Sequence, residues 1–225
     1  MEEKRLLLRI DFSTASESLI QVILDESPEP AILEEIVEAS TNRPDILRLL
    51  IENPGTPEAM RKKIADTLRL PASPKDGAAT VRRTPEERSQ TLLQRIQKLS
   101  VSEKIQLALR AGKEVRALLL RDTNKEVSLT VIDNPKITET EIELIAKSRS
   151  SPDEALRKIS KKREWMKNYN IIYALVTNPK TPAGISFPLV ALLKTRDLSL
   201  LAKNKNVSEG IRSLAKKLFR ARQAH

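Results

Sequence analysis

The residues best suited to chemistry in this chain are basic, and they concentrate between positions 158 and 169. The basic members of this segment are Lys158, Lys161, Lys162, Arg163 and Lys167. Trp165 and Tyr169 lie among them, and Trp165 is the only tryptophan of the chain. Lys and Arg neutralise phosphate charge, and aromatic rings stack on bases. The combination therefore indicates a contact with the phosphate backbone of a nucleic acid.

The spacing of the aromatic residues supports a second interpretation. Trp165 and Tyr169 fall on one helical face with Ile172, Tyr173 and Val176. Periodic apolar stripes of this kind usually pack inward. This spacing favours a core position for the aromatic rings, while the basic side chains form an exposed cluster in either case. A solvated helix face is the simplest explanation of that cluster.

A second basic group lies in the predicted C-terminal helix. It contains Arg212, Lys216, Lys217, Arg220 and Arg222, opposite an apolar side of Ile211, Leu214, Leu218 and Phe219. An amphipathic basic helix can lie on an acidic partner or on anionic lipid. The favoured alternative is a helix that caps the end of a helical stack. Together the two groups define a candidate binding surface of Lys158, Lys161, Lys162, Arg163, Lys167, Arg212, Lys216, Lys217 and Arg220.

Catalytic and metal chemistry finds little support in the sequence. There is no cysteine, and the only histidine is His225, the last residue. Glu34, Glu35 and Glu38 form an acidic group, but the apolar residues beside them favour a solvated helix face over acid–base catalysis. The five glycines form no phosphate-binding loop. We therefore expect a protein that is not an enzyme and that carries no metal and no cofactor.

Short proline-containing corners divide the chain. Asn53-Pro54-Gly55-Thr56-Pro57 recurs as Asn178-Pro179-Lys180-Thr181-Pro182, with a looser copy at Ser148-Arg149-Ser150-Ser151-Pro152. Proline ends one helix, and a Ser or Thr followed by proline is typical of the start of the next. The sequence thus predicts N-caps at Thr56, Ser151, Thr181 and Thr84. It also predicts capping boxes for the pairs Ser151–Glu154, Thr84–Glu87 and Thr138–Glu141.

Helical apolar spacing fills the segments between these corners. The predicted helices span 16–26, 30–40, 44–52, 57–69, 85–98, 102–110, 113–122, 124–133, 139–147, 152–161, 163–177, 182–194, 196–202 and 208–222. Residues 5–12 are predicted as a short strand or an extended arm. Helices this short need neighbours to bury their apolar stripes. Corner spacings of 26 and 30 residues predict an all-α fold, an irregular α-solenoid of short stacked helical hairpins.

Charge and composition indicate two modules with different surfaces, or an acidic face that contacts a basic one. Residues 1–70 contain 9 Lys and Arg against 14 Asp and Glu, whereas residues 71–225 contain 31 against 16. The sign changes at a segment rich in Pro and small residues, which indicates a linker at 71–83. The expected organisation is an acidic N-terminal helical module over 1–70 and a basic helical-repeat domain over 84–225.

The Asn-Pro-x-Thr-Pro corners, each followed by a short helix with Leu, Ile and Ala spacing, resemble the leucine-rich-repeat-variant and HEAT-like helical repeats of bacteria. Residues 90–222 also look similar to uncharacterised bacterial proteins. The resemblance implies a curved right-handed helical stack and implies no activity. The chain lacks the N-terminal cysteine cluster with which some leucine-rich-repeat-variant proteins bind an iron–sulfur centre, so the resemblance implies no such cluster here.

The function expected from these features is a scaffold that binds another protein, since stacked helices form extended binding faces. The alternative is a nucleic-acid-binding solenoid with weak sequence specificity, which the basic balance of residues 71–225 supports. No stretch has the length or the apolarity of a signal peptide or a membrane span, so a cytoplasmic location is expected. The sequence does not indicate an oligomeric state.

Overall fold

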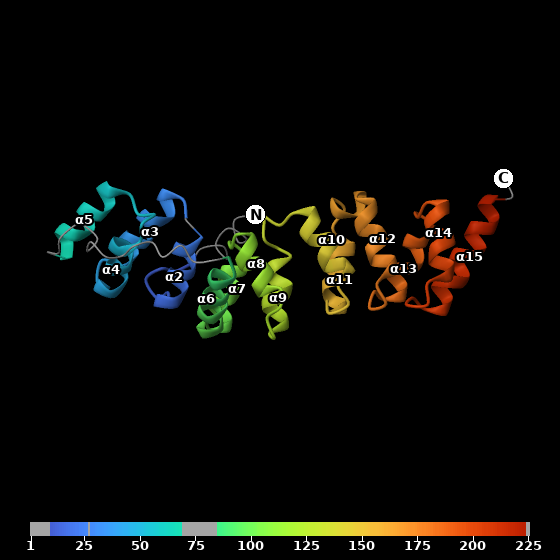
Figure 1. Cartoon of the computed structure of the whole chain (residues 1–225), viewed down its shortest axis with the longest axis horizontal. Helices are drawn as coiled ribbons and strands as arrows, with labels where there is room; N and C mark the ends of the chain where they lie inside the picture. The colour runs from blue at the N-terminus through green and yellow to red at the C-terminus, as the bar shows by residue number, and fades with distance from the viewer. Residues whose placement is uncertain (1–9, 27, 69–84, 224–225) are drawn as a thin grey trace. The chain divides into compact units, whose positions relative to one another are not determined.

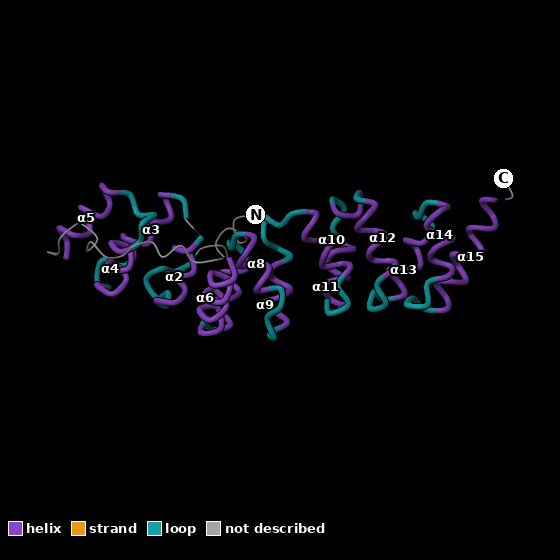
Figure 2. The backbone as a smooth tube through the Cα atoms, in the orientation of Figure 1, coloured by secondary structure: helices purple, strands orange, loops and turns teal. Residues whose placement is uncertain are grey.

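The computed structural model describes residues 10–26, 28–68 and 85–223, and every regular element in these ranges is a helix (Figures 1 and 2). The chain divides into two compact units, 1–135 and 136–225. In the first unit the helices are α2 (Glu17–Asp25), α3 (Pro30–Ala39), α4 (Pro44–Glu52), α5 (Glu58–Leu68), α6 (Pro85–Lys98), α7 (Val101–Ala108), α8 (Lys113–Leu119) and α9 (Lys125–Val131). The predicted all-helical class is therefore confirmed for the described residues.

The second unit begins with α10 (Glu139–Lys147) and α11 (Asp153–Lys161) and continues through the 3-10 helix η1 (Trp165–Lys167) to α12 (Tyr169–Thr177). It ends with α13 (Ala183–Val190), α14 (Thr195–Lys203) and α15 (Glu209–Gln223). α10 packs on α12, α12 on α13, and α15 on both α13 and α14. Aliphatic side chains of α12 to α15 form one core cluster of this unit, which includes Ile172, Val190, Leu198 and Ile211.

Four corners share one backbone hydrogen bond, which explains why the sequence repeats there. In each corner the carbonyl of the first residue accepts from the amide three positions later. The pairs are Asn53–Thr56 at 3.1 Å, Ser148–Ser151 at 3.2 Å, Asn178–Thr181 at 3.1 Å and Asn204–Val207 at 3.4 Å. This turn reverses the chain within a few residues. At the Asn53, Ser148 and Asn178 corners nearby prolines also interrupt the helical backbone, whereas the Asn204 corner contains no proline.

Two asparagine side chains tie a later helix end to an earlier one. Asn178, which follows α12, donates to the carbonyls of Ala146 and Ser148 at the end of α10, over 2.7 and 3.0 Å. Asn134, which follows α9, donates in the same way to Ala108 and Ala111 at the end of α7, over 2.8 and 3.1 Å. The last carbonyls of a helix lack intrahelical donors, so a buried amide satisfies groups that would otherwise be orphaned.

Several predicted caps are wrong. The N-caps of α11 and α13 are Pro152 and Pro182, and neither helix has a side-chain cap. The Ser151 hydroxyl instead donates backward to the Ile145 carbonyl over 2.7 Å, so it forms no capping box with Glu154. In the described residues the buried hydroxyls of Thr56 and Thr181 have no hydrogen-bond partner.

Other cap predictions have different outcomes. The Thr138–Glu141 capping box is present. An equivalent box at Ser100–Glu103, which begins α7, escaped the sequence analysis. The predicted pair Thr84–Glu87 lies outside the residues whose side chains are described, as do residues 5–9 of the predicted strand or arm. Residues 10–12 form no strand.

The predicted helix over 163–177 is wrong in one respect, because it is interrupted. A 3-10 turn covers Trp165–Lys167, and α12 begins only at Tyr169. Asn168 separates the two with an extended backbone, and its side chain accepts a hydrogen bond from the Asn170 amide at 2.9 Å. An asparagine in this position competes with the helix for backbone donors and starts a new helix.

The compact units differ from the predicted modules. The predicted linker at 71–83 lies outside the described residues, and the division falls instead at 135/136. The reason is that α2 packs on α6. The amide of Ser16 donates to Glu103 over 3.0 Å, and the Glu26 carboxylate accepts from the Gly112 amide over 2.7 Å. These contacts place α2 in one compact unit with α6, α7 and α8.

Glu103 is the most connected of these contact residues. Its carboxylate accepts hydrogen bonds from the amides of Ser16 and Ser100 and from the Ser100 hydroxyl. Burial raises the pKa of Glu103, but these hydrogen bonds outweigh burial and hold the pKa below its ordinary value of 4.5. Because the folded state favours the ionised form, Glu103 stabilises the fold above its unfolded pKa. This contribution is lost as pH falls through the lowered folded pKa.

We expect Glu103→Gln to lower stability at neutral pH and to reduce the loss of stability on acidification below pH 4.5. Urea unfolding followed by circular dichroism between neutral and acidic pH measures both effects. Glu114→Gln removes a charge from an exposed position on α8 and serves as the control. Parallel pH profiles for the wild type and Glu103→Gln would contradict this account.

Candidate functional site

The first predicted basic group lies at the end of α11 and in the turn that follows. Lys161, Arg163 and Lys167 are exposed, whereas Lys158 and Lys162 are half-buried. The Lys162 ammonium group lies 4.3 Å from the centre of the Trp165 ring. Part of this cluster therefore covers the core of its own unit, and three side chains are exposed.

The aromatic residues of this segment face inward. Only 6% of Trp165 is exposed, which confirms the core interpretation, although the ring belongs to η1 and not to a helix continuous with α12. The Tyr169 hydroxyl donates to Asp197 and accepts from the Lys194 amide at 2.9 Å. Burial, together with the hydrogen bond to Asp197, raises the pKa of Tyr169. Both rings are thus engaged within the second unit, which leaves Trp165 without a face for stacking on bases.

The second predicted basic group lies on α15. Lys216, Lys217 and Arg220 are exposed, whereas Arg212 is half-buried and pairs with Glu209 over 2.8 Å. The apolar side of α15 packs inward, with Ile211 in the core and Leu214, Leu218 and Phe219 against it. Arg222 donates to the carbonyls of Ala191 and Leu193 over 2.6 Å each, beyond the end of α13. These contacts fit the interpretation of α15 as a helix that packs on its own unit.

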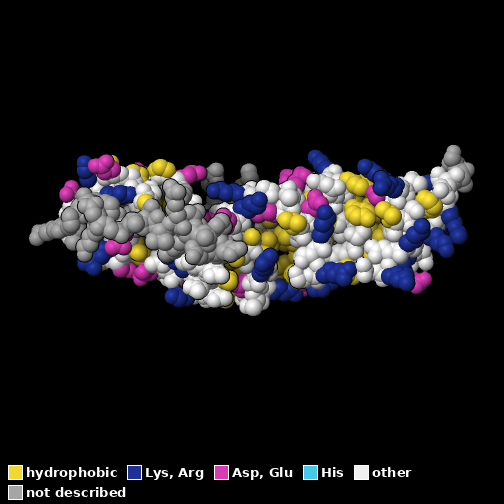
Figure 3. Space-filling view, in the orientation of Figure 1, with side chains coloured by type: hydrophobic (Ala, Val, Ile, Leu, Met, Phe, Trp, Pro, Cys, Tyr) yellow, Lys and Arg dark blue, Asp and Glu magenta, His cyan; other side chains and the backbone are white. Residues whose placement is uncertain are grey.

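The two basic groups are separate in space. Within the second unit α11 lies at one end beside α10, and α15 lies at the other end beside α14 (Figure 1). The nine predicted residues therefore form two clusters and not one surface. Basic residues nevertheless dominate this unit, since residues 136–225 contain 19 Lys and Arg against 8 Asp and Glu. On the face shown in Figure 3 they are spread around groups of hydrophobic side chains.

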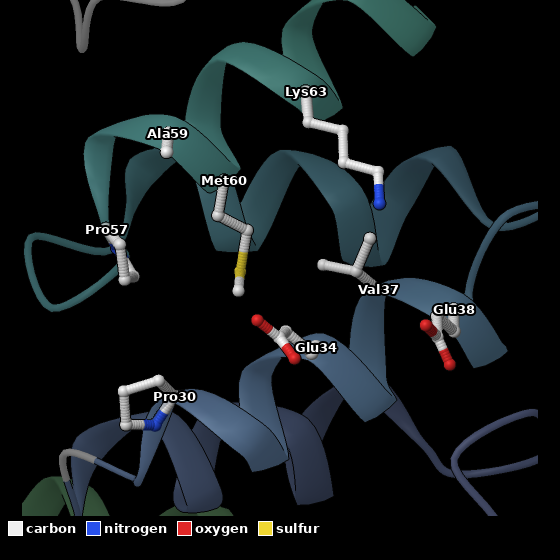
Figure 4. Close-up of a pocket in the computed structure, with 8 residues that line it drawn as sticks. All are labelled: Pro30, Glu34, Val37, Glu38, Pro57, Ala59, Met60 and Lys63. Atoms are coloured by element: carbon white, nitrogen blue, oxygen red, sulfur yellow. The ribbon is translucent and has the colours of Figure 1, made fainter.

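A groove that was not predicted from the sequence lies in the first unit, between α3 and α5. Its volume is about 540 Å³. The residues that line it are Pro30, Glu34, Val37, Glu38, Pro57, Ala59, Met60 and Lys63 (Figure 4). Most of these residues are exposed, and Met60 is the buried one. The groove is therefore an open surface feature with an apolar floor.

The charged residues of the groove come from both walls. Figure 4 shows the Glu34 carboxylate and the Met60 side chain directed toward each other from α3 and α5. Lys63 extends from α5 toward Val37. Among the described residues, Glu34, Glu38 and Lys63 form no ion pair within 4.0 Å. Their charges are thus available to a molecule that enters the groove.

The sequence pattern indicates the acidic wall of the groove but not the groove itself. Glu34 and Glu38 were assigned to a solvated face of one helix, and that face is indeed exposed. The opposite wall contains Met60 and Lys63 and belongs to α5, which begins about 20 residues after Glu38. Apolar periodicity within a helix does not indicate which helices lie side by side. Pro30 begins α3 and Pro57 precedes α5, but α4 and α6 also begin with proline, so this feature does not single out the two walls.

Two further findings concern the described residues. In the part of the chain that the structure describes, no group of three or more His, Cys, Asp or Glu side chains is arranged to hold a metal ion. No helix in the described ranges is both long and apolar enough to cross a membrane. Comparison with known proteins found no matching family model, no matching curated protein and no matching solved structure.

Proposed function

We propose that this protein is a non-enzymatic helical-repeat scaffold that binds a segment of another protein. The observation that carries the proposal is the groove between α3 and α5, where apolar side chains and charges without ion-pair partners are exposed together. Exposed apolar surface with a polar rim is typical of protein-binding sites. A groove between two surface helices also matches the form in which helical proteins accept a peptide or a helix.

The proposed architecture is an irregular α-solenoid of stacked helical hairpins, similar to leucine-rich-repeat-variant and HEAT-like proteins. Its support is the recurrence of one corner turn and of the asparagine bonds from a later helix end to an earlier one, at Asn134 and at Asn178. In such arrays each unit contacts its neighbours and the side chains on one face bind the partner. The proposal also includes a cytoplasmic location.

Blocking the groove tests the proposal. Ala59 lines the groove and is exposed, so Ala59→Arg fills the groove without disturbing the core. We expect the immobilised full-length chain to recover specific proteins from a lysate of its source, and Ala59→Arg to lose at least about 80% of them, since the inserted side chain occupies the binding volume. Quantitative mass spectrometry of the captured proteins measures the effect.

The matched control is Ala117→Arg, which introduces the same side chain at an exposed position on α8. It should recover the same proteins as the wild type. Equal recovery by Ala59→Arg and Ala117→Arg would rule out the groove as the binding site. Circular dichroism of both variants establishes that they are folded.

A nucleic-acid-binding scaffold is the second candidate, and the basic balance of residues 136–225 favours it. The same capture experiment separates the two when the lysate is treated with nuclease. Proteins that bind the groove are retained after this treatment, whereas proteins bridged by nucleic acid are lost. Capture that depends on nucleic acid and is unaffected by Ala59→Arg would favour the second candidate.

A further inference from the structure

We propose that the occupant of the groove is a basic amphipathic segment of a partner protein, whose apolar side chains enter between α3 and α5 and whose Lys or Arg side chains meet Glu34 and Glu38. This inference rests on the proposed protein-binding function and specifies the chemistry of the partner. The two walls of the groove differ in charge.

The charged residues of the α3 wall are all acidic. The helix contains Glu34, Glu35 and Glu38 and no Lys or Arg, and Glu29 precedes it as the N-cap residue. Glu34 and Glu38 are one helical turn apart, so both lie along the same edge of the groove. Two carboxylates on one edge repel each other and favour a cation between or beside them. A Lys or Arg of the partner supplies that cation.

The α5 wall carries charges of both signs, and most of these charged side chains already form contacts within the protein. Arg61 donates to the backbone carbonyls of Asn53 and Pro54 over 3.0 and 2.8 Å. Lys62 pairs with Glu58 over 3.3 Å. Among the described residues that line the groove, Lys63 is the one cation, and in Figure 4 it is directed toward α3. Lys63 therefore opposes the entry of a basic partner, while the two carboxylates favour it.

The surroundings of the groove have the same sign as the α3 wall. In residues 10–68 there are 5 Lys and Arg against 12 Asp and Glu. A surface of this balance attracts a basic partner over roughly one Debye length and excludes acidic ones. Charge at the edge of a site selects among partners, whereas the apolar floor of Val37, Ala59 and Met60 supplies the buried area.

The length of the groove suits a short helical segment. α3 has 10 residues and α5 has 11, which corresponds to walls of about 15 Å. Two to three turns of a helix cover this distance and place apolar side chains at positions i, i+3 or i+4 and i+7 along the floor. The groove is open and most of its lining is exposed, so it fits a segment that stays attached to a larger protein.

Three synthetic peptides test the inference against the full-length protein. Each is an amphipathic helix of about four turns with the same leucines, and the polar positions carry Lys in the first, Gln in the second and Glu in the third. We expect the Lys peptide to bind about tenfold more tightly than the Gln peptide, and the Glu peptide to bind weakest, because like charges at Glu34 and Glu38 repel it. Fluorescence anisotropy of labelled peptides at low and at physiological salt measures the order.

Charge-removing variants give effects of opposite sign. Relative to the wild type, the Glu34→Gln/Glu38→Gln double variant should weaken binding of the Lys peptide about five- to tenfold, and Lys63→Gln should strengthen it about two- to threefold. The matched controls are Glu52→Gln on α4 and Lys62→Gln on α5, which change charge at exposed positions outside the groove lining. Each control should change binding by less than about twofold.

The outcomes separate this inference from the proposed function. Equal binding of the Lys and Glu peptides, or equal effects of the groove variants and their controls, would overturn the basic partner. If these peptides all bind and Ala59→Arg abolishes their binding, the groove still binds protein segments and only the partner chemistry is wrong. If no peptide binds, the inference fails, and the capture experiment with Ala59→Arg decides the proposed function by itself.

Discussion

Replacing Trp165 with alanine is expected to lower the free energy of unfolding of the second unit by about 3–5 kcal/mol, because the change removes a large buried ring. Only 6% of this side chain is exposed. η1, which carries the ring, contacts both α11 and α12, so the ring lies where two helices meet. Chemical denaturation followed by far-ultraviolet circular dichroism measures the loss.

The control for this variant lies two residues away. Lys167→Ala changes an exposed side chain of the same 3-10 turn and should alter stability by at most about 0.5 kcal/mol. Trp165 is the only tryptophan of the chain, so it is the source of the tryptophan fluorescence of the wild type. The emission maximum should be shifted to the blue, as for a buried ring. A normal stability of Trp165→Ala combined with a loss of nucleic-acid binding would favour the stacking role and contradict the core position.

Replacing Asn178 with alanine is expected to cost about 2–4 kcal/mol, because it leaves buried backbone groups without partners. The Asn178 side chain donates to the carbonyls of Ala146 and Ser148 and accepts from the Lys180 amide at 2.9 Å. No other amino acid of this size supplies both donors and an acceptor in this geometry. Urea unfolding followed by Trp165 fluorescence reports on the second unit alone, since the chain has a single tryptophan.

Asn204 provides a matched control in the same unit. It occupies the same place in its corner and accepts from the Asn206 amide at 2.9 Å, but its side chain is only half-buried. Asn204→Ala should therefore cost about 1 kcal/mol. Asn178→Asp removes the donors at neutral pH, and protonation of the new carboxylate restores one of them. The loss of stability that this variant causes should therefore become smaller as pH falls. Equal losses for Asn178→Ala and Asn204→Ala would show that the bonds from Asn178 to the end of α10 contribute little.

Local sequence signals were most successful where the cause of a structure lies within a few residues. The helix over 139–147 was predicted with its observed bounds because Thr138 and Glu141 complete a capping box. The turn after Lys162 was missed, since the apolar spacing runs through Asn168 without a break. Ser151 was assigned to the helix that follows it, yet its hydroxyl bonds to the helix before it, and residue type does not distinguish these two directions.

The candidate site shows the same limit over longer distances. The sequence shows which residues are basic but not where they lie in the fold. Because α11 and α15 lie at opposite ends of their unit, the basic residues form two clusters. The groove was missed because its walls are two helices that periodicity treats separately. The contact of Glu103 with Ser16 was missed because the two residues are 87 positions apart.

The sequence by itself determined the helical class, most helix bounds to within about two residues, and the corners, because capping, proline geometry and apolar spacing act within one or two turns of the chain. Only the tertiary structure decided which helices pack together, and hence the two units and the groove between α3 and α5. The reason is that packing depends on which side chains fit against one another across the fold. A one-dimensional pattern of apolar and polar residues carries no record of those partners.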